Sequence, residues 1–261
     1  MKKLLALAMA LTLCLGLAAC GGDTTDASTD TTDDTAQTGE TVTLTVGATP
    51  APHQEILEQV VDDLAEQGIT LEIRPYNDYV MPNTAVEEGE DDANFFQHIT
   101  YMENFNAERG THLVNAGAIH YEPMGIYAGQ SDSLENIPDG AVIAVPNDAT
   151  NEGRALLLLQ DLGLLTLNED AGLEATPNDI ADNPHNLQFQ EMDAAMLPQT
   201  IEEVDFSIIN SNYALGAGYN PVTDSLAIES SDSPYVNVLV VKEGNEENPA
   251  IQALVEALEN V

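Results

Sequence analysis

Arg154 is the strongest single candidate for a functional residue in this sequence. Only six of the 261 residues are Lys or Arg, against 45 Asp and Glu, and Arg154 leads into a run of consecutive leucines typical of a buried helix. A guanidinium can bind a carboxylate through two parallel hydrogen bonds, and a helix N-terminus adds free N–H groups. Arg154 is therefore either the anchor for an anionic ligand or a structural partner of Asp148 or Glu152, and its spacing leaves both open.

Aromatic and amide side chains form a second group of candidates. Six of the thirteen Tyr and Phe residues lie between Tyr76 and Phe105. Four rings of this stretch could enclose an apolar or thioether group: Tyr79, Phe96, His98 and Tyr101. The alternative is that they belong to the hydrophobic core. Asn210 and Asn237 accompany apolar, strand-like runs, where an amide either caps the next helix or hydrogen-bonds a ligand.

The elements that must position these residues alternate between strands and helices. Alternating apolar patterns predict strands at 43–47, 69–74, 92–96, 118–127, 141–145, 187–190, 204–210, 226–228 and 236–241. Helical periodicity predicts helices at 53–67, 100–109, 151–162, 194–203 and 249–258. This alternation favours an α/β fold with mainly parallel sheets. Open α/β sheets bind ligands beyond the carboxyl ends of their strands, where several of the candidate residues lie.

The N-terminal segment is typical of an exported lipoprotein. Residues 1–19 combine Lys2 and Lys3 with an apolar stretch, as in a secretory signal peptide. The sequence Leu-Ala-Ala before Cys20 resembles a bacterial lipobox, which implies a lipid anchor on Cys20; an ordinary signal peptide is the alternative. Cys14 lies in the leader, so we expect no disulfide or thiolate site in the folded part. Residues 20–40, rich in Thr and Asp, are expected to be a disordered acidic tether.

Charge and motif content exclude several classes of function. The formal charge of −39 makes nucleic acid and anionic lipid headgroups unsuitable partners. The sequence contains no Gly-x-Ser-x-Gly elbow, phosphate-binding glycine loop or His-Glu-x-x-His pair, so we expect no enzyme and no cofactor. The five histidines show no metal-ligand spacing. An acidic cluster around Gly89 is interpreted as a solvated turn: Glu87, Glu88, Glu90, Asp91 and Asp92.

Seven blocks, in this order after the lipobox, resemble the NlpA family of methionine-binding lipoproteins: GATPAPHQEILE, DYVMPNTAV, DANFFQH, EPMGIY, IPDGAVIAVPNDATNEGRALLLL, INSNYAL and SPYVNVLVV. The resemblance spans about Val46 to Val241. It implies a two-lobe periplasmic-binding-protein type II fold with a ligand cleft between the lobes. It also implies capture of L- or D-methionine for an ABC permease and its ATPase, by a protein lipid-anchored on the extracytoplasmic face of the cell membrane.

The resemblance further implies roles for particular residues. Tyr79, Phe96, His98 and Tyr101 correspond to the aromatic side-chain pocket, and Arg154, Asn210 and Asn237 to the groups that hold the amino-acid backbone. His53 and Asn151 are expected near the cleft. Lobe one is expected to comprise residues 41–124 and 215–261, and lobe two 125–214. The family pattern also leads us to expect a further helical stretch after Val261, and Arg74-Pro75-Tyr76 departs from it. The alternatives are a binder of another amino acid or short peptide, and a surface lipoprotein for adhesion or assembly.

Overall fold

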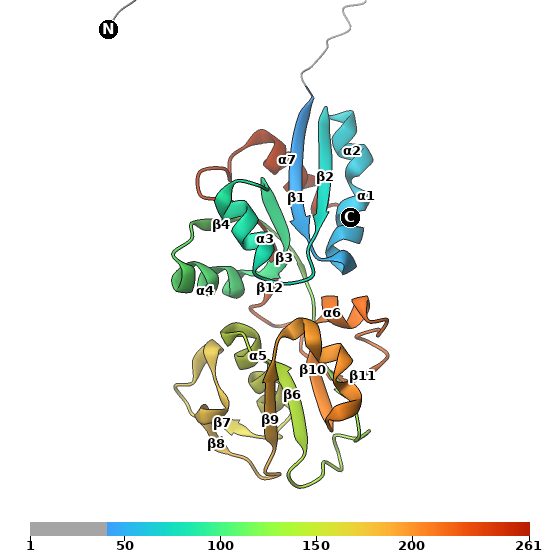
Figure 1. The fold of residues 1–261 in the computed structure, drawn as a ribbon, viewed down its shortest axis with the longest axis vertical. Helices are drawn as coiled ribbons and strands as arrows, with labels where there is room; N and C mark the ends of the chain where they lie inside the picture. Colours follow the sequence, from blue (N-terminus) through green and yellow to red (C-terminus); the bar gives the residue numbers. More distant parts are fainter. Residues whose placement is uncertain (1–40) are drawn as a thin grey trace, which may run out of the picture. The chain divides into compact units, whose positions relative to one another are not determined.

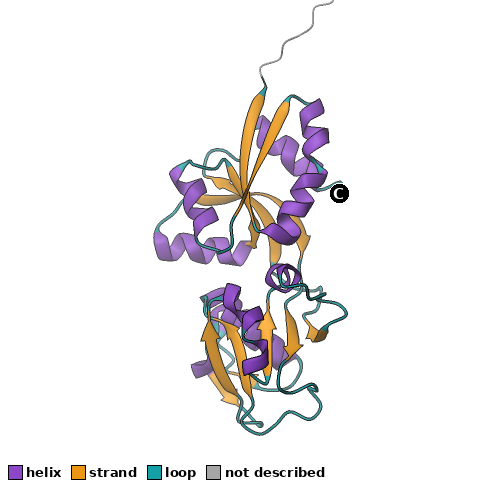
Figure 2. Cartoon of the chain, turned by 45° about the vertical axis from the view of Figure 1, so that its right-hand side comes forward, coloured by secondary structure: helices purple, strands orange, loops and turns teal. Residues whose placement is uncertain are grey.

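The structure is a computed structural model that describes residues 41–261. The expected signal peptide (1–19), the lipidated Cys20 and the acidic tether (20–40) lie outside the described residues. Within the described part, no helix has both the length and the apolar character needed to cross a membrane. The described chain forms two five-stranded sheets with associated helices (Figures 1 and 2).

The first sheet has the strand order β2-β1-β3-β12-β4. Its strands are β1 (Val42–Ala48), β2 (Ile69–Pro75), β3 (Ala93–His98), β4 (Leu113–Tyr121) and β12 (Val236–Lys242). Its helices are η1 (Pro50–Gln54), α1 (Glu55–Gln59), α2 (Val61–Glu66), α3 (Met81–Glu88), α4 (Ile99–Arg109) and α7 (Pro249–Leu258). Phe95 packs into the cluster with α1, α2 and α7, whereas Phe96 packs into the one with α3 and α4. Both faces of β3 are therefore buried, because neighbouring residues of a strand point to opposite faces.

The second sheet has the strand order β11-β5-β10-β6-β9. Its strands are β5 (Gly125–Ala128), β6 (Val142–Pro146), β9 (Gln188–Met192), β10 (Phe206–Ile209) and β11 (Ser225–Ile228). The helices of this part are α5 (Ala149–Asp161), η2 (Gly172–Glu174), η3 (Pro177–Asp179), η4 (Ala194–Gln199), η5 (Ile201–Glu203) and α6 (Ser211–Gly216). A small separate pair consists of β7 (Thr166–Leu167) and β8 (Ile180–Asp182). The leucines of α5 pack on one face of the sheet, and η4 and η5 pack on the other.

Both sheets are mixed, so the prediction of mainly parallel sheets was wrong. Strands joined by helices within one sheet are parallel, as β1 is to β2 and β3, and β6 to β9 and β10. Strands at which the chain passes between the sheets run the other way: β12 is antiparallel to β3 and β4, and β5 to β10 and β11. A helical crossover returns the chain to the same end of a sheet, whereas a chain arriving from the other sheet enters at the opposite end.

The chain passes between the sheets twice. The predicted strand 118–127 is two strands, because β4 ends at Tyr121 in the first sheet and β5 begins at Gly125 in the second. The return was expected after residue 214. However, β11 pairs with β5, so the return lies between Ile228 and Val236. Hydrogen bonding of this short strand to the second sheet cannot be read from its local pattern.

Several predicted helices differ in detail. The predicted helix 53–67 is divided into η1, α1 and α2, with a break at Val60, where φ is −102° and ψ is 0°. The predicted helix 194–203 consists of two 3-10 helices, and Pro198 lies within the first, where its missing N–H and its ring disfavour an α-helix. Helix α3 was not predicted. It ends at Gly89, whose φ of 77° favours glycine.

The acidic cluster near Gly89 is not entirely a solvated turn. Asp91 is buried and accepts hydrogen bonds from Arg74 Nη1 at 2.6 Å and from the Tyr76 hydroxyl at 2.9 Å. The Arg74-Pro75-Tyr76 segment that departs from the family pattern thus supplies both partners of this carboxylate. The interpretation as a solvated turn was wrong for Asp91. Its partners Arg74 and Tyr76 lie at the end of β2, outside the run of acidic residues around Gly89, so the local sequence did not reveal them.

Candidate ligand-binding site

A pocket lies where the carboxyl ends of β3, β6 and β10 meet. The lining residues are Tyr79, Phe96, Gln97, His98, Tyr101, Glu122, Asn151, Arg154, Asn210, Ser211, Asn212 and Asn237. All seven residues expected to bind a ligand line this one pocket, together with Asn151. His53 does not line the pocket but contacts Asn237, which does.

Four lining residues were not singled out from the sequence: Gln97, Glu122, Ser211 and Asn212. All four lie inside the blocks that carry the family resemblance: Gln97 in DANFFQH, Glu122 at the start of EPMGIY, and Ser211 and Asn212 in INSNYAL. Gln97 directly precedes His98 on β3. Their proximity to predicted residues was the available signal, but it did not distinguish pocket walls from neighbouring core.

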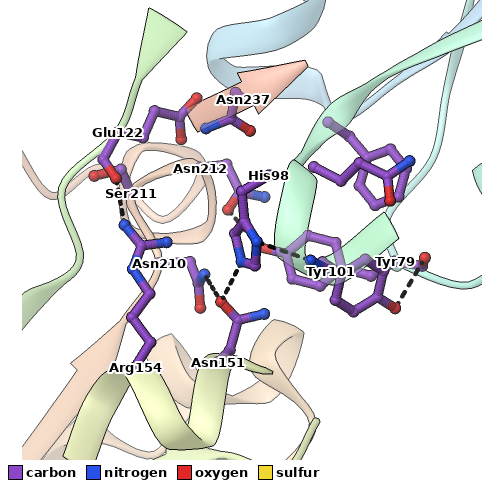
Figure 3. Close-up of a pocket in the computed structure, with 12 residues that line it drawn as sticks. Tyr79, His98, Tyr101, Glu122, Asn151, Arg154, Asn210, Ser211, Asn212 and Asn237 are labelled. Atoms are coloured by element: carbon purple, nitrogen blue, oxygen red, sulfur yellow. Dashed lines mark hydrogen bonds between the residues drawn. The ribbon is translucent and has the colours of Figure 1, made fainter. Parts of the chain in front are cut away.

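Aromatic rings form one end of the pocket (Figure 3). Tyr79 lies 5.6 Å from Phe96 and 5.7 Å from Tyr101, measured between ring centroids. The Tyr101 hydroxyl donates to the Tyr79 backbone carbonyl at 3.2 Å. Tyr213 of α6 packs against Tyr79 at 4.9 Å. This arrangement offers ring faces and edges to an apolar or polarisable side chain.

His98 links the aromatic end to the polar end, and its hydrogen bonds define its tautomer. Its Nδ1 accepts from the Tyr101 backbone N–H at 3.1 Å, which caps α4, and lies 2.7 Å from Thr100 Oγ1. Nε2 therefore carries the proton and donates to Asn151 Oδ1 at 3.1 Å. Burial, together with the positive charge of Arg154, lowers the pKa of His98 to about 3. The imidazole is consequently neutral at physiological pH.

A chain of amides orients Asn210. Asp148 caps α5 by accepting from the Asn151 backbone N–H at 3.1 Å and from Asn151 Nδ2 at 2.8 Å. Because a carboxylate only accepts, Asn151 must present its Oδ1 to the pocket side, where it receives Asn210 Nδ2 at 2.8 Å. Asn212 Oδ1 similarly accepts from the Tyr79 hydroxyl at 2.6 Å. Among the described residues, Asn210 Oδ1 and Asn212 Nδ2 are buried without a hydrogen-bond partner.

Arg154 lines the pocket and also forms a buried ion pair, but not with Asp148 or Glu152. Its Nε donates to the Glu229 carboxylate at 3.0 Å, and its Nη2 donates to Glu229 and to the backbone carbonyl of Glu122, the latter at 2.7 Å. The guanidinium lies 4.5 Å from the centroid of the Tyr235 ring. Only 3% of Arg154 is exposed. Nη1 makes no hydrogen bond to any described residue, so its N–H groups remain free to donate.

Beside Arg154, two histidines share one carboxylate. Glu122 Oε1 lies 2.6 Å from His120 Nε2 and 3.1 Å from His53 Nε2. His53 is held from its other side by Thr49 Oγ1, 2.7 Å from Nδ1, and its Nε2 also lies 3.3 Å from Asn237 Oδ1. Burial raises the pKa of Glu122, but the facing histidines and Arg154 outweigh it and hold this pKa below its usual value.

The same three side chains correct the prediction that no histidines have metal-ligand spacing. The potential ligand atoms of His53, His120 and Glu122 lie within 4.8 Å of one another, close enough to hold a metal ion. Strands β2 and β3 and most of β4 lie between His53 and the other two residues in the sequence, so a local spacing pattern could not reveal the group. The distances of 2.6 and 3.1 Å to Glu122 are those of hydrogen bonds.

Each of the two mixed β-sheets carries its own helices, and residues from both parts form one buried polar pocket. This arrangement is a two-lobe fold of the periplasmic-binding-protein class. The family model described as NlpA lipoprotein matches residues 44–261. The chain therefore belongs to the NlpA lipoprotein family.

Several known proteins are similar to this chain. A methionine-binding lipoprotein, MetQ, of Bacillus subtilis is 39% identical over 263 residues, which cover 99% of this chain and 92% of the relative. A putative lipoprotein from Ruminococcus gnavus, of known crystal structure, is 55% identical with a TM-score of 0.82, covering 83% of this chain and 90% of that one. A nutrient-binding protein from Burkholderia cenocepacia, solved bound to methionine, is 41% identical with a TM-score of 0.79, covering 83% and 91%.

Proposed function

We propose that this protein is the substrate-binding lipoprotein of an ABC importer and that it captures methionine in the pocket between its lobes. In this proposal the protein binds its ligand without chemical turnover and delivers it to a membrane permease and its ATPase. Its site of action is the extracytoplasmic face of the membrane, where a lipid on Cys20 anchors it. We further propose that residues 41–124 and 229–261 form lobe one, and residues 125–228 form lobe two.

The observation that carries this proposal is the division of the pocket into two chemically different ends (Figure 3). Arg154, Glu122 and Asn237 gather at one end, whereas the rings of Tyr79 and Tyr101 lie at the other. An amino acid with an unbranched apolar side chain has the same division. A thioether suits ring faces and edges because sulfur is polarisable. The methionine-bound relative supports this choice of ligand.

Each lining group has a proposed role. Arg154 Nη1 donates to the ligand carboxylate, and the side chains of Asn210 and Asn237 orient the amino-acid backbone. Tyr79, Phe96, His98 and Tyr101 surround the thioether. The neutral state of His98 suits this position, because a charged imidazolium would face both a buried apolar group and Arg154. Asn151 acts through His98 and Asn210, which it holds by hydrogen bonds.

A binder of another amino acid or of a short peptide is the second candidate, and a role in adhesion or assembly is the third. The small, enclosed pocket favours one amino acid over a peptide, because its lining residues Arg154, Asn151 and His98 are almost wholly buried. An adhesin has no need of a buried pocket with an unpaired guanidinium edge. Calorimetric titration of methionine separates these candidates.

We expect the protein, freed of copurified ligand by unfolding and refolding, to bind methionine in calorimetry. Arg154→Ala should weaken binding about 30-fold to several thousand-fold, equivalent to roughly 2–5 kcal/mol, because the ligand carboxylate would lose its partner in a buried site. Arg109→Ala is the matched control, since Arg109 stacks on Phe105 and does not line the pocket. Absence of heat with either enantiomer would refute the methionine assignment, and mass spectrometry of copurified ligand would identify the actual one.

A further inference from the structure

We propose that Glu122 is the receptor for the ligand's α-ammonium group and that it restricts the pocket to ligands with a free amino group. This inference rests on the proposed function for the remainder of the ligand. The proposed function does not assign a role to Glu122. The aromatic rings of the pocket and Arg154 would also accept a thioether carboxylic acid without an amino group, so they do not provide this selectivity.

Glu122 is the one acidic residue among those that line the pocket, as Arg154 is the one basic residue. The nearby carboxylate of Glu229 is already occupied. It accepts from Arg154, from the Tyr121 hydroxyl at 2.7 Å and from Ser233 Oγ at 3.2 Å. In Glu122, by contrast, both histidine contacts fall on Oε1. No hydrogen bond within residues 41–261 involves its Oε2, so this oxygen can accept from an ammonium.

The carboxylate of Glu122 is held in position before a ligand arrives. His120 and His53 contact its Oε1 at 2.6 and 3.1 Å, and Thr49 holds His53 in turn. The glutamate side chain is 12% exposed. An acceptor whose position is set by neighbouring groups loses little conformational freedom on binding, which favours affinity. The two imidazoles occupy the oxygen that the ligand does not need.

The position of Glu122 relative to Arg154 matches an α-amino acid. Arg154 Nη2 donates to the Glu122 backbone carbonyl at 2.7 Å, so the guanidinium and this glutamate are direct neighbours. The ammonium and carboxylate groups of an α-amino acid are bonded to the same carbon, and their two counter-charges must therefore be adjacent. Figure 3 shows the Glu122 side chain beside the Asn237 amide, at the end of the pocket where Arg154 lies.

Local charge adds to this selectivity. Arg154 is paired with Glu229, and the two histidines beside Glu122 contact only its Oε1, so a ligand ammonium can contact the other oxygen. A zwitterion brings its own ammonium to Glu122. An acid that lacks the ammonium would place its carboxylate near that of Glu122 without adding a counter-charge, in a buried site where the repulsion is poorly screened.

The test compares L-methionine with its 2-hydroxy analogue, which replaces the ammonium by a hydroxyl and keeps the carboxylate and thioether. We expect the wild-type protein to bind methionine at least about 100-fold more tightly than the analogue. Glu122→Gln should weaken methionine binding about 30-fold or more and leave binding of the analogue unchanged or stronger. The ratio of the two affinities should therefore fall below about tenfold.

Glu87→Gln is the matched control, because Glu87 also contacts a histidine, His112 at 3.2 Å, but does not line the pocket. It should keep the wild-type ratio. A wild-type protein that binds both compounds equally would overturn the inference whether or not the variant folds. Retention of the wild-type ratio by folded Glu122→Gln would overturn it while leaving methionine binding intact. Failure of the wild-type protein to bind methionine would instead refute the proposed function and this inference with it.

Discussion

At the scale of single residues, Arg154 can pair with Glu229 and still offer a donor to the pocket, because a guanidinium has five N–H groups. Nε and Nη2 face Glu229 and the Glu122 carbonyl, and Nη1 remains for the pocket. An unpaired charge in such a buried place is costly, so Glu229 supplies the counter-charge of Arg154 and holds it in position. The structural pairing of Arg154 with Glu229 is thus compatible with its proposed role as ligand anchor.

The prediction at this scale concerns the ion pair. Glu229→Gln should lower the free energy of unfolding by about 3–5 kcal/mol, because it leaves the Arg154 charge buried without its counter-charge. Urea unfolding followed by circular dichroism measures the effect. Glu87→Gln removes the charge facing Lys242, which is 3.4 Å away and 43% exposed, and should cost less than about 1 kcal/mol. Equal losses in the two variants would contradict the importance of the buried pair.

At the scale of elements, helix α5 positions two residues at the polar end of the pocket. Asp148 caps it, and its first turns present Asn151 and Arg154, three residues apart and therefore on the same helix face. Its later leucines lie in the core of the second sheet. Gly153 lies on α5 where an added Cβ atom would collide with the Leu173 backbone oxygen. The contact between α5 and η2 thus sets the position of the two pocket residues.

Gly153→Ala should therefore displace α5 or η2. We expect a loss of stability of about 1–3 kcal/mol or more from overpacking, and weaker methionine binding because Asn151 and Arg154 move with the helix. Thermal unfolding and calorimetry measure the two effects. Gly216→Ala, on α6, is the control, since a Cβ there meets nothing within 4 Å. A Gly153→Ala protein with wild-type affinity would show that α5 tolerates the shift without consequence for the pocket.

At the scale of the whole folded part, side chains from the two sheets meet around the pocket. Tyr79 bonds Asn212, His98 bonds Asn151, and the Tyr213 hydroxyl donates to the Asn77 carbonyl at 3.3 Å. Arg154 and the amide groups of the pocket are buried in this arrangement, and the Glu122 side chain is 12% exposed. A ligand that enters must first break such contacts, so we expect the lobes to separate for entry and release.

Small-angle scattering tests this expectation. The ligand-free protein should have a larger radius of gyration than the methionine-bound protein, because separated lobes expose the pocket walls. Arg154→Ala at the same methionine concentration should resemble the ligand-free wild type, which separates binding from non-specific effects of the amino acid. Superimposable curves with and without bound methionine would mean that the ligand enters by a smaller, local movement.

Sequence patterns were most informative where structure depends on neighbouring residues. Most strands of both sheets and helices α4, α5 and α7 lie where apolar periodicity predicts them. Patterns were least informative where a distant partner decides the outcome. Asp91 is buried because Arg74 and Tyr76 reach it from β2, and β11 joins the second sheet because it pairs with β5. Neither partner can be identified from the residues beside Asp91 or β11.

For the site, residue types and motif order identified the candidate groups: a cation at the start of an apolar helix, a group of rings and several amides, in blocks that resemble one family. The pairing of these groups depends on the folded arrangement of distant segments. Glu229 lies 75 residues from Arg154, and Glu122 is linked to His53 as well as to its near neighbour His120. Side-chain types and local periodicity are properties of the chain, whereas the partner of a buried charge depends on which distant segments folding brings within a few ångströms. The sequence therefore identified Arg154 as the residue to explain, and the fold supplied Glu229 and Glu122.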